Sequence, residues 1–240
     1  MSTENNFVFT SPVVMVFPNL DKPRAVTLKG KEIGAPKYSA NFLLPPDHLD
    51  LAALKALVAK TAKTAWPDRD IAAKGADGRS LIGWPWRNGD VLANKRQATN
   101  KAKGKLDPAD PTKGLDDSAF QRGKLVLVAR SAYPVGLAVL RGDKLVTLSL
   151  EGLAPFMKSH FYSGVLAVPE IDIVASTIPG DSDGPDKLYV TAYLKSVFST
   201  GKGDRIAGGA KDPNAVFSGY IGRASTESVG VSELDDEISL

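Results

Sequence analysis

Residues 188–195 alternate apolar and polar side chains with a period of two, and no other feature constrains the fold as strongly. The apolar set is Leu188, Val190, Ala192 and Leu194, and the alternate set is Tyr189, Thr191, Tyr193 and Lys195. Because successive side chains of a β-strand point to opposite faces, this pattern predicts a strand with one buried face and one face carrying two tyrosines and a lysine. Such a strand needs partners, so we expect a fold built on a sheet.

Other apolar and β-branched runs predict the remaining strands, at 7–17, 25–28, 38–44, 124–132, 135–140, 145–150 and 164–175. A helix is predicted near 51–62, between the early strands, because Leu51, Leu54, Val58 and Ala62 recur at helical spacing. The expected fold is therefore mainly β: a small OB-fold-like barrel with one helix between early strands and long loops. A β-sandwich is an alternative that the pattern leaves open.

Residues 67–123 are rich in Gly, Pro, Asp and Lys and predict a long basic loop region. Five cations without an acid lie between positions 94 and 106, namely Lys95, Arg96, Lys101, Lys103 and Lys105. They predict a mobile clamp for phosphate groups, with a merely solvated loop as the alternative.

The charge of the chain is divided unevenly. The last basic residue is Arg223, and five acids follow it, namely Glu227, Glu233, Asp235, Asp236 and Glu237, before the chain ends at Leu240. Without these five acids, the chain has 30 basic and 22 acidic residues, which is a net charge of +8. We therefore predict a basic domain over 1–223 and a disordered acidic tail over 224–240 that binds partners or competes with nucleic acid. A solubilising tail is the alternative.

The sequence contains no complete enzyme motif. Residues 201–206 begin like a dinucleotide-binding loop, but Ile206 stands where the third glycine would be. Residues 181–186 begin like a calcium loop, but Pro185 replaces an oxygen ligand. There are two histidines and no cysteine, which excludes thiolate metal sites. We expect a non-catalytic protein with no cofactor and no metal; a nuclease is the enzymatic alternative, which no spacing favours.

Single-stranded nucleic acid requires cations for its phosphates and flat side chains for its unpaired bases, and the chain interleaves the two. The candidate DNA-binding residues are Trp84, Trp86, Arg87, Lys95, Arg96, Lys101, Lys103, Lys105, Arg130, Tyr133, Tyr162, Tyr189, Tyr193, Lys195, Phe198, Lys202 and Arg205. The alternative is that the tyrosines pack under a loop and the tryptophans close the end of a barrel. The candidate partner-binding residues of the tail are Glu233, Asp235, Asp236, Glu237 and Leu240.

Four short stretches occur in an order that resembles one known family. They are PWRNGD at 85–90, GKLVLVARSAYPVG at 123–136, FYSG at 161–164 and GKGDRIAGG at 201–209. The chain resembles the phage single-stranded DNA-binding proteins with an OB-fold, a family long known only as a phage domain of unknown function. The resemblance implies sequence-independent binding of single-stranded DNA in phage replication and recombination. It also implies an acidic tail for protein partners, although such proteins often end in an aromatic residue and this chain ends in Leu240.

A rival hypothesis from another class is a structural or interaction module, such as a virion component whose basic loop binds an acidic protein. The polar N-terminus does not have the pattern of a signal peptide, and no apolar run is long enough to span a membrane. We therefore expect a cytoplasmic protein that does not bind membranes. DNA and RNA are not distinguished by any of these residues.

Overall fold

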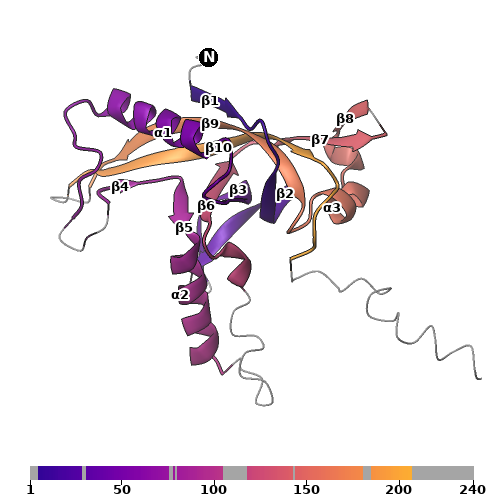
Figure 1. The fold of residues 1–240 in the computed structure, drawn as a ribbon, viewed down its shortest axis with the longest axis horizontal. Helices are drawn as coiled ribbons and strands as arrows, with labels where there is room; N and C mark the ends of the chain where they lie inside the picture. Colours follow the sequence, from indigo (N-terminus) through magenta and orange to yellow (C-terminus); the bar gives the residue numbers. More distant parts are fainter. Residues whose placement is uncertain are drawn as a thin grey trace, which may run out of the picture. The chain divides into compact units, whose positions relative to one another are not determined.

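Strands dominate the chain, as the computed structural model shows (Figure 1). The structure describes residues 5–28, 31–75, 78, 80–104, 118–142, 144–180 and 185–206. The compact unit ends at Ile206, so the acidic tail and the predicted boundary at 223 lie outside the described residues.

The strands are β1 (Asn6–Val8), β2 (Val13–Leu28), β3 (Lys31–Leu44), β4 (Ile82–Gly83), β5 (Trp86–Asn88), β6 (Leu125–Ser131), β7 (Gly136–Arg141), β8 (Lys144–Leu148), β9 (Leu166–Ile178) and β10 (Lys187–Ser199). The helices are α1 (Leu51–Ala65), α2 (Gly89–Ala102) and α3 (Ala154–His160), with short 3-10 turns at Ala119–Gln121 and Leu150–Gly152. The predicted mainly β class is confirmed.

Five strands close into a ring in the order β2, β3, β6, β10 and β9. The ring closes where β9 returns to β2, with Ala167 opposite Val13 and Leu166 opposite Val14. Only these two residue pairs of β2 and β9 are in strand register, and Met15 adds backbone hydrogen bonds to Gly164 and Val165 just before β9, so the described strands make a ring rather than a regular barrel. β1 pairs with β9, β7 pairs with β10 and carries β8, and the short β4 and β5 pair with β10 and β6.

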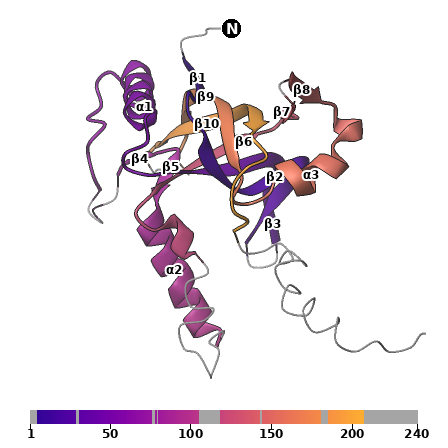
Figure 2. The same cartoon turned by 45° about the vertical axis from the view of Figure 1, so that its right-hand side comes forward.

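The inside of the ring is the main hydrophobic core. Phe42, Leu127, Ile171 and Leu194 point into it from four strands and are almost completely buried. The predicted helix α1 is present between β3 and β4, and its apolar residues join this core from beside β9 and β10 (Figure 2). Because each strand alternates, the side chains between these core positions lie on the outside of the ring, which we call the outer face.

Helix α2 corrects the prediction that residues 67–123 form a long loop. Asn88 caps it, its side-chain oxygen accepting hydrogen bonds from the amides of Asp90 and Val91 at 2.8 and 3.2 Å. Its buried residues are Gly89, Ala93 and Asn100, so the stripe lacks the large apolar side chains that reveal a helix in a sequence. Both views show α2 extending away from the strands, beginning at β5 (Figures 1 and 2).

The break expected between the predicted strands 7–17 and 25–28 is also absent, because β2 continues through it to Leu28. Pro18 and Pro23 suggested a break, since proline donates no ladder hydrogen bond. The strand accommodates them with irregular pairing: the register against β3 shifts between Val16 and Asn19 and again between Asn19 and Arg24. A hairpin of β2 and β3 therefore extends along one side of the outer face.

No helix in the described ranges is both long and apolar enough to cross a membrane.

Candidate nucleic-acid interface

Strand β10 has the alternation that the sequence predicts. Val190, Ala192 and Leu194 are buried in the core. On the outer face Tyr189 is 37% exposed and Tyr193 is 41% exposed. Both tyrosines are therefore accessible on a strand that is paired with its neighbours, which is what base stacking requires.

One pocket of the outer face surrounds Tyr189, and we call it the β10 pocket. It measures about 360 Å³ and is lined by Gly83, Trp84, Pro85, Arg87, Val128, Arg130, Tyr189, Val190 and Thr191. Its lining thus combines aromatic and aliphatic side chains with those of two arginines, Arg87 and Arg130. A flat, hydrophobic base and its phosphate present the matching chemistry.

The aromatic side chains of the β10 pocket are held in place by close packing. Gly83 lies opposite Tyr189 in the pairing of β4 with β10. A Cβ atom on Gly83 would lie 2.4 Å from Cδ1 of Tyr189, so only glycine leaves room for the ring. The ring of Trp84 stacks on Trp86 with centroids 6.0 Å apart and planes at 8°, and its Nε1 donates to Ser80 Oγ at 2.9 Å.

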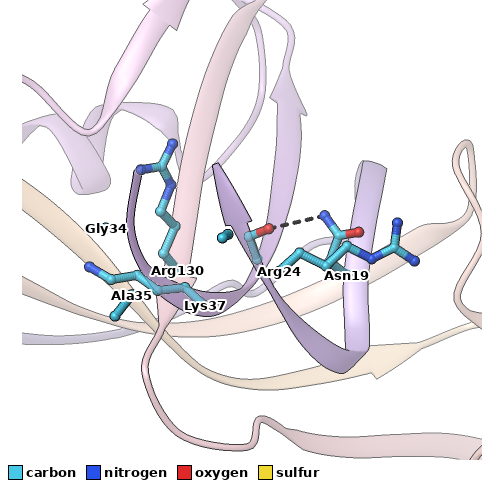
Figure 3. Close-up of a pocket in the computed structure, with 8 residues that line it drawn as sticks. Asn19, Arg24, Gly34, Ala35, Lys37 and Arg130 are labelled. Carbon is cyan, nitrogen blue, oxygen red and sulfur yellow. Dashed lines mark hydrogen bonds between the residues drawn. The ribbon is translucent and has the colours of Figure 1, made fainter. Parts of the chain in front are cut away.

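A second pocket lies where the β2–β3 hairpin meets β6, and we call it the hairpin pocket (Figure 3). It measures about 480 Å³ and is lined by Asn19, Arg24, Ala25, Gly34, Ala35, Lys37, Ser39 and Arg130. Three of these residues are cations, and none of the described lining residues is an acid or an aromatic residue. Asn19 Nδ2 donates to Ser39 Oγ at 3.2 Å, which links β2 to β3 within the lining of the pocket.

Sequence reasoning missed Arg24 and Lys37. They lie opposite each other in the register of β2 and β3, and both are exposed. In the sequence each of the two follows a proline, Pro23 or Pro36, and no local pattern links one to the other. Their pairing across the hairpin depends on the irregular register, which the sequence does not reveal.

Arg130 belongs to both pockets and joins them. It pairs with Ser39 of β3 on one side and with Tyr193 of β10 on the other. Its half-buried side chain therefore lies between the aromatic residues of β10 and the cations of the hairpin. Together the two pockets form a continuous surface of aromatic and cationic groups across β10, β6, β3 and β2.

Lys195 is placed differently from the other predicted cations. Its Nζ lies 3.5 Å from Asp172 Oδ2 and 3.8 Å from Glu170 Oε1 on β9. Asn6 Nδ2 donates to both carboxylates at 3.0 Å, and Ser196 Oγ donates to Glu170 at 2.7 Å. These carboxylates offset the charge of Lys195 and make the β9 side of the outer face acidic.

The remaining predicted residues lie in other parts of the fold. Lys95, Arg96 and Lys101 are on α2 and Lys103 ends it, so these cations follow a helix and not a loop. Tyr133 is 78% exposed in the turn between β6 and β7. Phe198 is half-buried at the end of β10. Lys105 and the tail residues Glu233, Asp235, Asp236, Glu237 and Leu240 lie outside the described residues.

Tyr162, Lys202 and Arg205 gather near α3, away from the two pockets. The guanidinium carbon of Arg205 lies 4.1 Å from the ring centroid of Tyr162. The Tyr162 hydroxyl donates to the carbonyl of Gly203 at 2.8 Å, and Arg205 also donates to the carbonyl of Lys158. This cluster stabilises the segment that ends the described chain.

A third polar cluster joins Ser11, His48 and Asp50 and superficially resembles a catalytic triad. The Asp50 amide donates to His48 Nδ1 at 3.2 Å, so Nδ1 is the acceptor and Nε2 carries the proton. Nε2 faces Ser11 Oγ at 3.3 Å, and that hydroxyl donates to Asp50 Oδ2 at 3.0 Å. The imidazole in this tautomer cannot take the serine proton, as a general base must.

Asp50 instead ties the N-terminal strands to α1. Its carboxylate also accepts hydrogen bonds from the Thr10 hydroxyl at 2.6 Å and from the amides of Thr10 and Ser11 at 3.0 and 3.1 Å. Burial alone would raise the pKa of Asp50, but these hydrogen bonds outweigh it and hold the pKa below its usual value. The cluster therefore has a structural role.

The ring of strands is similar in fold to a solved phage single-stranded DNA-binding protein. The single-stranded DNA-binding protein from bacteriophage Enc34 has this fold, with 18% sequence identity and a TM-score of 0.50 over 90% of this chain and 96% of that chain. The same protein in complex with ssDNA gives 22% identity and a TM-score of 0.48, over 87% and 96% of the two chains. Gp2.5, a single-stranded DNA-binding protein encoded by bacteriophage T7, gives 11% and 0.43 over 94% and 96%.

The resemblance indicated by the four sequence stretches is thus confirmed at the level of the fold. No protein-family model matches the chain, and no curated protein matches its sequence.

Proposed function

We propose that this protein binds single-stranded DNA across the outer face of β10, β6, β3 and β2, without catalysing a reaction on it. The observation that carries the proposal is the position of Arg130, which joins an aromatic pocket to a cationic pocket. The shared fold with the Enc34 single-stranded DNA-binding protein supports it.

The two pockets divide the recognition of a nucleotide chain between them. Tyr189, Tyr193 and Trp84 offer flat faces to bases, and each stacked base contributes about 1–3 kcal/mol. Arg24, Lys37 and Arg130 neutralise phosphates, which releases counterions and makes the affinity dependent on salt. Every base has a π-face, so stacking of this kind favours unpaired strands without selecting a sequence.

The biological role that follows is coverage and protection of single-stranded DNA during phage replication and recombination. The acidic tail would recruit proteins of those processes or compete with DNA for the basic outer face. Both activities would take place in the cytoplasm.

The proposal is tested by titrating the intrinsic tryptophan fluorescence with a 12-nucleotide oligo-dT, in the wild-type protein and in Arg130→Gln. We expect quenching in the wild type, because Trp84 lines the β10 pocket. Arg130→Gln should weaken binding by about 5- to 30-fold, which corresponds to ~1–2 kcal/mol for a charge-assisted contact. Arg141→Gln is the matched control, since Arg141 is exposed at the end of β7, away from both pockets.

Equal weakening by both substitutions would show that only general charge matters and would contradict the proposed surface. Absence of quenching in the wild type, or cleavage of the oligonucleotide when Mg²⁺ is present, would contradict the proposed function.

A further inference from the structure

Phe17 combines two properties that rarely occur together. Its backbone φ is +51°, and it is the one non-glycine residue of the described chain with a positive φ. A bulky L-residue is an outlier there, because its Cβ crowds the following carbonyl oxygen. Its side chain is nevertheless 49% exposed. A strained residue whose ring is not needed inside the core is a candidate for a role in ligand binding.

The surroundings of Phe17 hold this conformation in place. It lies in the irregular part of β2, between the paired residues Val16 and Asn19. Its amide donates to Ser163 Oγ at 2.9 Å, and its ring is tilted against Phe120 with centroids 6.0 Å apart. One side of the ring is therefore supported by protein, and the rest remains open to solvent.

Phe17 adjoins the hairpin pocket. Asn19, which lines that pocket, donates to the carbonyl of Phe17 at 3.5 Å and to Ser39 Oγ at 3.2 Å. The hairpin pocket itself has no aromatic residue among its described lining residues. Phe17 supplies the flat apolar surface that the cations of this pocket lack.

The strand order places Phe17 on the opposite side of the outer face from Tyr189 and Tyr193. The ring runs from β10 through β6 and β3 to β2, which is three inter-strand spacings, or about 14 Å. Arg130, on β6, lies between the two aromatic sites.

We propose that Phe17 is a second base-stacking site, which holds a nucleotide of the strand whose neighbours occupy the β10 pocket. The inference rests on the proposed function and extends it, because the strand then has an aromatic contact on each side of the cations. The alternative is that Phe17 only covers Phe120.

Two substitutions that keep the same strained backbone separate these roles. Phe17→Tyr retains a flat ring, whereas Phe17→Leu retains apolar cover for Phe120 without a π-face. With a 12-nucleotide oligo-dT, we expect Phe17→Tyr to bind within about twofold of wild type and Phe17→Leu to bind about 5- to 30-fold more weakly. Phe7→Leu, the same change on the half-buried aromatic residue of β1, is the control and should bind like wild type.

Thermal unfolding of each variant shows whether a change in affinity reflects a change in the fold. Wild-type affinity of Phe17→Leu would overturn the inference, as would equal weakening by Phe17→Leu and Phe17→Tyr. Tyr189→Leu serves as the reference for the proposed function. If it weakens binding and Phe17→Leu does not, only the second site is wrong; if the wild-type protein does not bind the oligonucleotide, both proposals are wrong.

Discussion

Substituting Gly83 by alanine tests the β10 pocket without removing any functional side chain. The new Cβ atom would lie 2.4 Å from Cδ1 and 2.8 Å from Cε1 of Tyr189, whereas ordinary contacts begin near 3.4 Å. The ring must therefore retreat by roughly 1 Å, and with 37% of Tyr189 already exposed, it can turn toward solvent. Stacking on a displaced ring is lost in whole or in part, so we expect a cost of about 1–2 kcal/mol, or 5- to 30-fold in affinity.

The measurement is a double-mutant cycle by oligo-dT titration. In a Tyr189→Ala background the added Cβ meets no ring, so Gly83→Ala should then change the affinity less than twofold. Gly152→Ala is the matched control, because a Cβ there would meet only Ser149 Oγ, at 3.7 Å. Additive losses in the double variant, or wild-type affinity of Gly83→Ala, would refute the reasoning.

Three further predictions follow from other parts of the chain. Because the folded state lowers the pKa of Asp50, its contribution to stability is present above the unfolded pKa of about 3.9 and is lost as the pH falls through the folded value. Asp50→Asn should therefore reduce the free energy of unfolding by ~2 kcal/mol at pH 7, with a smaller difference at pH 3 in denaturant titrations; an equal difference at both pH values would refute this. Replacing Glu170 and Asp172 by their amides should release Lys195 and strengthen oligonucleotide binding by about two- to fivefold, and unchanged affinity would show that this cation lies off the DNA path. Deleting residues 227–240 should strengthen binding at low salt, whereas unchanged affinity would leave the tail a role in solubility or in partner binding.

The local patterns that were strong in the sequence predicted the fold well. The alternation at 188–195 predicted both the strand β10 and its exposed tyrosines, and the apolar stripe containing Leu54 and Val58 predicted helix α1. Helix α2 was missed because its buried residues, Gly89, Ala93 and Asn100, carry no hydrophobic signal. The Asn88 cap was a signal of its start that could have been used.

The candidate site was only partly predictable, because it is assembled by pairing between distant strands. The sequence around Arg130 and Tyr189 predicts both as DNA-binding residues. That they line a common pocket depends on the parallel pairing of β6 with β10, which the sequence does not reveal. The cations Arg24 and Lys37 lie opposite each other only because the hairpin register is irregular. The sequence around Lys195 contains no acid that would pair with it, because its carboxylate partners lie on the neighbouring strand β9. The local periodicity of the sequence predicts none of these contacts between strands.

The most direct test of the central claim is a salt series comparing a 12-nucleotide single strand with a duplex of the same sequence. Four cations line the two pockets, Arg24, Lys37, Arg87 and Arg130. If each neutralises a phosphate, the logarithm of the binding constant should fall with the logarithm of the salt concentration with a slope of about −3 for the single strand. We predict this slope together with at least tenfold preference for the single strand. A flat salt dependence, or equal or tighter binding of the duplex, would contradict it.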